Sequence, residues 1–522
     1  MSMFTNFLAR KNESKKAPST EELIERGFAP KNGRIDVLFI YPPSTVSDRL
    51  GVEDMGEVGG DTIPLGIASL AAYLRDKGFG VGVLDCTALR LNNDKIHEII
   101  KKKDPAIIGY SVTTYGLGTA LEIAKEIREK FPTKLTLCGG VHARDAPEQS
   151  IYDFFDIVTY GKDGEIIIHD IVKKYSTKNF NRNSFLQDFV TLESIKGIVF
   201  RKNNISVKTA PSKIIENLDE LPFPARDLMP MERYVPFPNA YRRLPATNMV
   251  LIRGCPYFCT FCSEASTGAR RRSPEKAIAE IRHCIEEHGI KEIHFWDDTL
   301  SYHRKWMKDF LNQLIKTNLD ISWTCFAAVN TVDKEILQLM AKSGCWRIFY
   351  GYETAVPALA KNLLTNKKNR DLDNMKKIAQ LTREAGIDAN GSFMIGLPGE
   401  TPELAKQTIQ NAIDLDPDTA QFSIATPYPG TQLYKEIKEG KWGKFLTTDL
   451  KNFSGSAAAT WLPFGYSSPE ELKKMQSYAF RRFYLRPKYI FKQILKIRSF
   501  KDIKKYFIGA KALVKGYLIP NM

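Results

Sequence analysis

The segment MVLIRGCPYFCTFC, residues 249–262, joins an apolar run typical of a buried strand to three closely spaced cysteines. Cys255, Cys259 and Cys262 have the spacing C-x₃-C-x₂-C. Three thiolates on one tight loop can hold three irons of a [4Fe–4S] cluster, which leaves the fourth iron open to a small molecule. A structural zinc site would need a fourth Cys or His close by, and none follows in register. The spacing therefore favours an iron–sulfur cluster with an open iron.

Further strands and helices alternate downstream of this loop. Apolar runs predict strands at 290–296, 321–328, 346–351, 388–399 and 419–430, and helical patterns such as 274–289 separate them. Six strand–helix units favour a partial (β/α)₆ barrel, which need not close to eight. Catalytic residues would then lie at the carboxyl ends of the strands.

A second alternating series precedes the loop. Its apolar strands are expected at 35–43, 81–86, 106–112, 135–140 and 155–161, with helices between them. This order predicts an α/β fold with a doubly wound, Rossmann-like parallel sheet. Ligands of such sheets lie across the carboxyl ends of the strands, where Pro42–Pro43, Ser111–Thr114 and Gly139–His142 stand here.

Composition shifts divide the chain into five parts. Asn/Lys-rich loops, an expected hairpin at 197–209 and a proline-dense stretch at 221–238 separate the two alternating series. The last part loses its strands and becomes helical and basic. The expected parts are a polar lead (1–32), the first sheet domain (33–175), the hairpin and Pro-rich linker (176–243), the barrel core (244–441) and the C-terminal region (442–522).

The cysteine loop, with Phe261 as its aromatic residue, resembles that of the radical S-adenosylmethionine (AdoMet) superfamily. The resemblance implies that the three cysteines ligate the cluster and that AdoMet chelates its open iron. It implies further AdoMet contacts in WDDTLS (296–301), GYET (351–354) and MIGLPGET (394–401). The residues concerned are Phe261, Asp297, Asp298, Glu353, Gly396 and Pro398. Loop capping or ion pairing is the structural alternative for the three carboxylates.

The first sheet domain resembles the cobalamin-binding domain that precedes the barrel in many radical AdoMet enzymes. The shared features are paired prolines after the first strand, a Ser/Thr loop after the third and GG-x-H after the fourth. The resemblance implies that Ser111, Thr113, Gly139 and Gly140 line the pocket of the nucleotide tail. The D-x-H-x-x-G loop of other cobalamin proteins is absent, so His142 is expected in tail contact or packing rather than on cobalt. The segment GKDGE (161–165) departs from the acidic G-E-G-E pattern common there.

Together the two resemblances imply a methyltransferase. A deoxyadenosyl radical would remove hydrogen from an unactivated carbon, and methylcobalamin would supply the methyl group. An oxidative cyclase or ring rearrangement without net methyl transfer, on the same scaffold, is the alternative. A cobalamin sensor would have no use for the cysteine triplet. A methylthiotransferase would need three N-terminal cysteines, and only Cys86 and Cys138 precede the barrel.

The net charge of +15 among 522 residues is concentrated at one end. Residues 470–522 hold 14 Lys+Arg against 3 Asp+Glu, interleaved with aromatics. A helical cap on the barrel, an amphipathic surface on anionic membrane and a nucleic-acid patch are the three interpretations, and the Arg486–Pro487 pair favours the cap. Eight scattered cysteines and no apolar span indicate a cytoplasmic protein, with peripheral contact to the inner membrane face left open. Expected partners are a small-molecule or lipid-like substrate and an electron donor such as flavodoxin or ferredoxin, with nucleic acid disfavoured.

Overall fold

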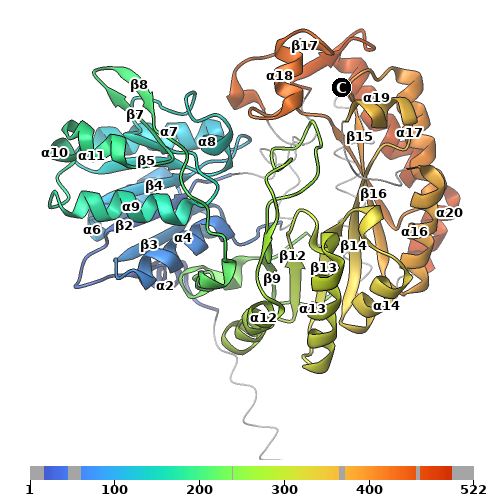
Figure 1. Ribbon diagram of the computed structural model, residues 1–522, viewed down its shortest axis with the longest axis horizontal. Helices are drawn as coiled ribbons and strands as arrows, with labels where there is room; N and C mark the ends of the chain where they lie inside the picture. Colours follow the sequence, from blue (N-terminus) through green and yellow to red (C-terminus); the bar gives the residue numbers. More distant parts are fainter. Residues whose placement is uncertain (1–16, 45–59, 238, 364–370, 454–458, 496–522) are drawn as a thin grey trace, which may run out of the picture.

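The computed structural model describes residues 17–44, 60–237, 239–363, 371–453 and 459–495. Within these ranges the chain forms two large sheets of mainly parallel strands (Figure 1). A stretch containing short 3-10 helices connects them. The α/β fold class expected from the alternating pattern is confirmed.

The first sheet has eight strands in the order β1-β3-β2-β4-β5-β6-β7-β8. The central five, from β3 to β6, are parallel, and their near-continuous apolar runs are buried on both faces. The strands are β1 (Phe28–Ala29), β2 (Val37–Tyr41), β3 (Val81–Asp85), β4 (Ile107–Ser111), β5 (Leu135–Gly139), β6 (Ile157–Thr159), β7 (Ile198–Lys202) and β8 (Ile205–Lys208).

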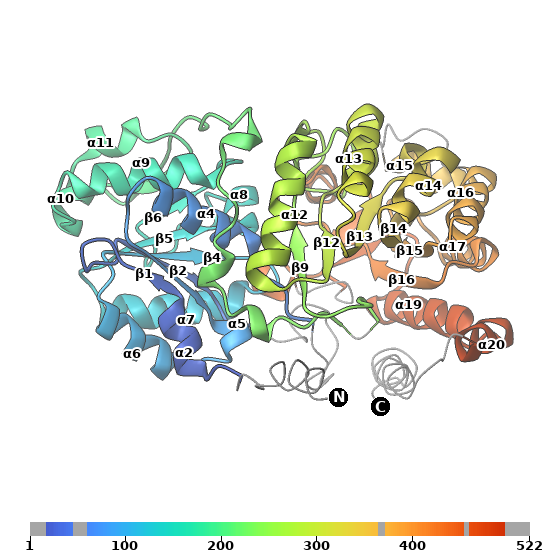
Figure 2. The same cartoon turned by 90° about the horizontal axis from the view of Figure 1, so that it is seen from below.

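Helices cover both faces of this sheet (Figure 2). One core lies under α4 and α9, and a second lies under α2, α5, α6 and α7. The helices are α2 (Thr20–Arg26), α4 (Leu65–Asp76), α5 (Cys86–Leu89), α6 (Asn93–Lys103), α7 (Leu117–Lys130), α8 (Val141–Asp145), α9 (Gly164–Ser176), α10 (Arg182–Gln187) and α11 (Phe189–Ser194).

The hairpin β7–β8 differs from its expected place. The sequence pattern assigns it to the connection between domains, whereas the structure pairs β7 antiparallel with β6 at the edge of the first sheet. Its apolar side chains explain the difference, because Ile198, Val199 and Phe200 are fully buried against that sheet. The connection proper then contains η2 (Leu218–Glu220), η3 (Arg226–Leu228) and η4 (Met231–Arg233).

The second sheet has six parallel strands in the order β16-β15-β14-β13-β12-β9, an open barrel rather than a closed one. Helices cover its outer face. The strands are β9 (Ala246–Met249), β12 (Glu292–Phe295), β13 (Ser322–Ala327), β14 (Cys345–Glu353), β15 (Asp388–Ile395) and β16 (Thr419–Ile424). The helices are α12 (Pro274–His288), α13 (Arg304–Lys316), α14 (Lys334–Lys342), α15 (Pro357–Asn362), α16 (Leu372–Glu384) and α17 (Pro402–Leu415), with η5 (Leu300–Tyr302) and η6 (Val329–Thr331) in the loops.

Local signals fix the ends of these helices. In α12 the Ser273 hydroxyl accepts a hydrogen bond from the Lys276 N–H at 3.1 Å, and Pro274 occupies the first helical position. Gly289 ends the helix in the left-handed conformation. The buried stripe of α12, which includes Ile278 and Ile281, then faces the sheet.

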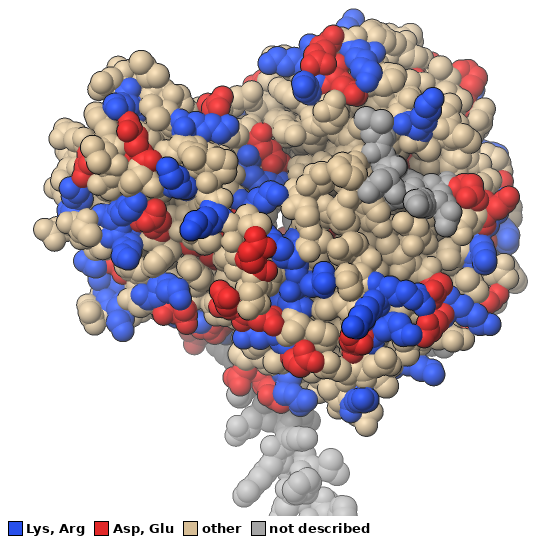
Figure 3. All heavy atoms as spheres, in the orientation of Figure 1, with Lys and Arg blue, Asp and Glu red and all other residues tan. Residues whose placement is uncertain are grey.

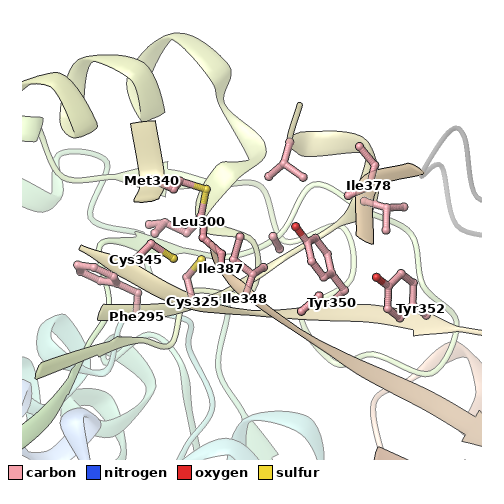
Figure 4. Packing of buried hydrophobic residues seen from close by; sticks show 14 of the residues in the cluster. Phe295, Leu300, Cys325, Met340, Cys345, Ile348, Tyr350, Tyr352, Ile378 and Ile387 are labelled. Carbon is pink, nitrogen blue, oxygen red and sulfur yellow. The ribbon is translucent and has the colours of Figure 1, made fainter. Parts of the chain in front are cut away.

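The core of the second sheet is aromatic and sulfur-rich. Figure 4 shows the side chains of Phe295, Cys325, Cys345, Tyr350 and Tyr352 in one buried cluster with residues of the helices that cover the sheet. Farther along, Tyr352 stacks on Phe393 and Phe393 on Phe422, with ring centroids 5.5 and 5.4 Å apart. Packing of this kind is the expected role of the cysteines outside the triplet.

The C-terminal region packs on the open edge of the second sheet. Residues Leu472, Ala479 and Phe480 of α19 (Pro469–Tyr484) lie in the same core as β15 and β16. The other elements are α18 (Gln432–Lys438), β17 (Gly443–Phe445), η7 (Leu450–Asn452), β18 (Trp461–Pro463) and α20 (Pro487–Leu495). The hairpin β17–β18 shows that strands continue beyond residue 441. No described helix has the length and apolar character needed to span a membrane.

Candidate functional site

The three cysteines lie on a loop closed by a short antiparallel ladder. Strands β10 (Ile252–Arg253) and β11 (Arg270–Arg271) pair on either side of it. At its start Gly254 has φ of +88°, and a Cβ there would lie 1.9 Å from the carbonyl oxygen of Gly268. Only glycine allows this close approach of the two loop ends. The Cys255 N–H then donates to the Thr267 hydroxyl at 3.0 Å, which fixes the base of the loop.

The thiols gather in one small apolar cluster. Cys255 and Cys259 are 8% and 6% exposed, Cys262 is half-buried, and Tyr257 and Phe261 pack with them. Burial raises the pKa of the Cys262 thiol to about 12, so its thiolate needs a cation beside it. Among the described residues no three His, Cys, Asp or Glu side chains converge on a single metal position. A four-iron cluster takes each thiolate on a separate iron, and the three thiols of this loop supply that donor set.

Asp297 and Asp298 follow β12 and differ in their surroundings. The Asp297 carboxylate is buried and accepts the N–H groups of Leu251 and Ile252 at 2.7 and 2.5 Å. It thereby holds the backbone that enters the cysteine loop. The pairing of β9 with β12 ends at Met249, so β9 shares only that residue with the strand predicted at 249–254. Asp298 lies beside the loop, where partial burial and the Glu264 carboxylate raise its pKa to about 6. Asp298 is the member of the pair whose side chain faces outward.

Glu353 ends β14 in a strained conformation. Its φ is +51°, the left-handed region that costs a non-glycine residue about 1–2 kcal/mol, and the pairing of β14 with β15 shifts register there. Its Oε1 lies only 2.5 Å from the position a side chain of residue 351 would take. Strain of this kind at a strand end is typical of functional sites.

The turn after β15 contains Gly396 and Pro398. The buried Glu400 carboxylate accepts the Gly396 N–H at 2.5 Å and the Tyr466 hydroxyl at 2.7 Å, which fixes the turn. Leu397, between them, packs in a cluster with Phe261 of the cysteine loop. The structure therefore brings the cysteine loop and this turn together, as a shared ligand would require.

In the first sheet, the predicted residues lie at the carboxyl ends of β4 and β5. Ser111 and Thr113 line a small cavity together with Pro42 and Pro43. Gly140 has φ of +95°, and a Cβ there would lie 2.6 Å from the Val112 carbonyl oxygen. Gly139 ends β5 directly before it.

His142, on α8, is 1% exposed. Its Nδ1 is 3.1 Å from the Thr114 hydroxyl, and its Nε2 has no partner within the part of the chain that the structure describes. Desolvation lowers the pKa of His142 to about 4, so the ring is neutral. A buried nitrogen without a partner is rare in a folded protein, and it fits a site that holds a further polar group.

Sequence reasoning missed one group of residues at this site. Arg253 and Arg270, at the two ends of the cysteine loop, form ion pairs with Asp163 in the first sheet domain. Arg144 of that domain pairs with Glu264 of the loop. The departure of GKDGE from the expected acidic pattern was the one available signal. The pairs join positions about 90 to 120 residues apart, and no local pattern specifies such distant partners.

Two family descriptions match the chain. "Radical SAM superfamily" matches residues 249–412, and "B12 binding domain" matches residues 54–167. An uncharacterized methyltransferase of Pyrococcus horikoshii is 32% identical over 485 residues, which cover 89% of this chain and 95% of that protein. The anaerobic magnesium-protoporphyrin IX monomethyl ester cyclase of Cereibacter sphaeroides is 29% identical over 73% of this chain and 61% of its own length.

A solved structure has the same arrangement of elements. The radical S-adenosylmethionine methyltransferase TsrM from Kitasatospora setae, with cobalamin and a [4Fe–4S] cluster bound, matches 92% of this chain and 99% of its own with a TM-score of 0.66. The sequence identity is 18%, so this likeness concerns the fold alone.

Proposed function

Because the chain belongs to the radical SAM superfamily, with a B12 binding domain before the barrel, we propose that it is a cobalamin-dependent methyltransferase. Its substrate is a small molecule, which receives a methyl group on an unactivated carbon. One observation carries the proposal: a loop with three cysteines opens at the strand ends of a six-stranded parallel barrel. Side chains from the strand-end loops of the first sheet contact that same loop.

In this proposal Cys255, Cys259 and Cys262 each hold one iron of the cluster. Asp298 meets the amino group of AdoMet, because its carboxylate lies beside Cys262 and faces outward. Asp297 acts differently, since its Oδ1 already accepts two backbone N–H groups and holds the loop entrance. Asp297 is then a positioning residue through Oδ1, while its buried Oδ2, which has no partner among the described residues, stays open to a polar group of a ligand.

The remaining AdoMet contacts come from the far side of the barrel. Glu353 meets the ribose or the carboxylate end of AdoMet, and the Gly396–Pro398 turn lies against the adenine. Phe261 connects the two halves of this pocket, because its ring packs with both the cysteines and Leu397.

Cobalamin binds at the strand ends of the first sheet. Gly139 and Gly140 allow its nucleotide tail to approach the backbone, and Ser111 and Thr113 supply hydroxyls. His142 offers its unpartnered Nε2 as a hydrogen-bonding group, with the ring oriented by Thr114. When bound, the cofactors supply a radical from AdoMet and a methyl group carried on cobalt. The chain's own residues orient them and exclude water.

Anaerobic reconstitution with iron, sulfide and cobalamin tests the proposal. We expect the full chain to bind a [4Fe–4S] cluster and cobalamin and to release deoxyadenosine from AdoMet once a one-electron donor is added. A Cys259→Ala variant should lose both the cluster and deoxyadenosine release, while Cys284→Ala, a buried helix position, should keep both. Absence of cobalamin from the reconstituted wild-type protein would contradict the proposal.

An oxidative cyclase is the second candidate, favoured by the relative from Cereibacter sphaeroides. Product mass separates the two reactions, because methylation adds one CH₂ and cyclisation removes hydrogen. The P. horikoshii relative, which is named a methyltransferase and matches nearly the full length of both chains, favours methylation.

We also propose two partners of the enzyme. A flavodoxin or ferredoxin supplies the electron, and deoxyadenosine release with either protein in place of dithionite tests this.

The second partner is an anionic membrane surface. Its support is the apolar face of α20, where Phe491 is 63% exposed, together with the basic composition that follows. Cosedimentation with phosphatidylglycerol vesicles, but not with phosphatidylcholine vesicles, is the expected result, and loss of α20 apolar residues should abolish it.

The face drawn in Figure 3 does not resemble a nucleic-acid surface. Figure 3 shows Lys and Arg interspersed with Asp and Glu on the face drawn, rather than gathered into one basic field. A nucleic-acid surface would be expected to cluster its positive charge.

A further inference from the structure

Side chains of the first sheet domain hold both ends of the cysteine loop. Arg253, directly before Gly254, donates to Asp163 at 2.9 Å and to Glu165 at 2.7 Å. Arg270, directly after the loop, donates to Asp163 at 2.6 Å. The Asp163 and Glu165 side chains are 0% and 4% exposed, so the carboxylates of these ion pairs are shielded from water.

Two more contacts hold the second half of the loop. The Lys162 ammonium group donates to the Thr267 carbonyl oxygen at 3.0 Å. Arg144 pairs with both Glu264, two residues after Cys262, and its own neighbour Asp145. Positively and negatively charged side chains lie along the boundary between the first sheet domain and the barrel (Figure 3). The loop is thus fastened to the first domain at four points.

The fastening residues lie at the same end of the sheet as the cobalamin-binding residues of the proposed function, on α8 and after the neighbouring strand β6. Arg144 lies one turn along α8 from Gly140 and two residues from His142. Lys162, Asp163 and Glu165 follow β6, the next strand of the sheet. A group bound at these strand ends would therefore order the residues that grip the cysteine loop.

Stability alone does not explain this arrangement. Removing charged groups from water carries a desolvation penalty that can offset the attraction of a buried ion pair, whereas the geometry such a pair imposes is specific. Asp163 also accepts the Ile215 N–H at 2.7 Å, so its carboxylate is held from several directions. Arg253 then has little freedom, and neither has the loop that begins next to it.

We infer that this four-point clamp, formed by Arg144, Lys162, Asp163 and Glu165 on the cysteine loop, couples the cobalamin site to the cluster site. Binding of cobalamin stabilises the clamped arrangement and so favours cluster assembly, and the assembled cluster favours cobalamin binding to the same extent, as linkage requires. Arg253 and Arg270 are positioning residues in this device. The inference rests on the proposed function, since it needs both cofactors.

The test compares cobalamin affinity with and without the cluster. Hydroxocobalamin is titrated anaerobically into the full-length protein before and after iron–sulfur reconstitution. We expect the reconstituted wild-type protein to bind about tenfold more tightly, within the usual range of coupling between sites. In Arg253→Gln the two affinities should be equal. Cobalamin should likewise raise the iron content reached by the wild-type protein but not that reached by Arg253→Gln.

Two further variants separate coupling from folding. Arg243→Gln removes an exposed ion pair with Asp320 on the far part of the barrel and should keep full coupling. Glu165→Gln preserves side-chain shape and should reduce coupling even if Arg253→Gln fails to fold. Equal affinities with and without the cluster in the wild-type protein, or full coupling in a folded Arg253→Gln or Glu165→Gln, would overturn the inference alone. Failure of every form to bind cobalamin would instead overturn the proposed function.

Discussion

Glu353 combines backbone strain with a carboxylate at a strand end. Its φ of +51° favours glycine, so the strain persists only because the surrounding structure imposes it. We expect Glu353→Gly to be about 1 kcal/mol more stable than Glu353→Ala, because glycine relieves the left-handed strain. Both variants should bind AdoMet at least about tenfold more weakly, since each loses a charged hydrogen-bonding group.

Urea unfolding of the cluster-free proteins and equilibrium dialysis of AdoMet with the reconstituted proteins measure the two effects. Glu353→Gln is the matched control for shape. Unchanged AdoMet affinity in Glu353→Ala would assign this carboxylate to loop structure alone.

Sequence patterns identify chemistry at single residues better than they identify partners. The cysteine spacing and the G-x-E segment point to residues that do lie at strand ends of the second sheet. The pattern could not separate Asp297 from Asp298, because both follow the same strand. The structure distinguishes them, because the backbone N–H groups of Leu251 and Ile252 donate to Oδ1 of Asp297. That contact joins positions 46 and 45 residues apart.

At the scale of elements, the junction of β5 and α8 is tightly constrained. A Cβ on Gly140 would meet the Val112 backbone at 2.6 Å in a conformation that disfavours side chains. Gly140→Ala should therefore destabilise the first domain by about 2 kcal/mol or more and weaken cobalamin binding. Gly118→Ala, in the first turn of α7 with open space around it, should be neutral or slightly stabilising.

Thermal unfolding and hydroxocobalamin titration of the two variants provide the comparison. If Gly140→Ala matched Gly118→Ala in both measurements, the close backbone approach at β5–α8 would have no role in the site.

The turn after β15 contains a buried acid that should make stability depend on pH. Burial raises the pKa of Glu400 to about 7, above its value in the unfolded chain. Between about pH 4.5 and pH 7 the folded state therefore binds more protons than the unfolded state, and stability falls as pH rises. Glu400→Gln cannot ionise, so its stability relative to wild type should increase over this window by up to about 3 kcal/mol.

Urea unfolding of the two proteins at several pH values measures this difference. Glu403→Gln serves as the control, because hydrogen bonds from its own backbone and from Thr401 lower the pKa of that exposed carboxyl. Its difference from wild type should not grow as pH rises through 7. A pH-independent difference between Glu400→Gln and wild type would show that folding leaves the pKa of Glu400 unshifted.

Apolar runs and capping residues predict most of the helices and strands, and the elements that they misplace have physical causes. The first barrel strand ends at Met249 because the Asp297 carboxylate captures the next N–H groups. The hairpin β7–β8 joins the first sheet because β6 offers a free edge. Local periodicity does not show which sheet edge a strand pairs with, or which distant acceptor binds its N–H groups. The sequence therefore could not predict where strands end or which sheet the hairpin joins.

At the scale of the whole molecule, the connection between the sheets is a packed structure rather than a loose tether. Arg226 of η3 is completely buried and donates to Glu280 of α12 at 2.9 Å and to the Asn248 carbonyl oxygen at 3.0 Å. The sequence marks this stretch as a linker by its prolines, and that composition gives no hint of a buried arginine. The two sheets are thus joined both here and at the cysteine loop, and we expect them to unfold together.

Substitution of Arg226 tests that cooperativity. Arg226→Met leaves the Glu280 carboxylate buried beside only the Arg272 guanidinium, which is 3.7 Å away. We therefore expect the free energy of unfolding to fall by about 3 kcal/mol. Arg226→Met with Glu280→Met should recover most of this loss, because apolar side chains of similar volume replace a buried ion pair at little cost. Arg243→Met, at an exposed pair, should change little. Calorimetry should show one main transition in the wild-type and double-variant proteins, and two transitions in Arg226→Met, where the sheets separate. A single unshifted transition in Arg226→Met would mean that the contacts at the cysteine loop suffice to hold the two sheets together.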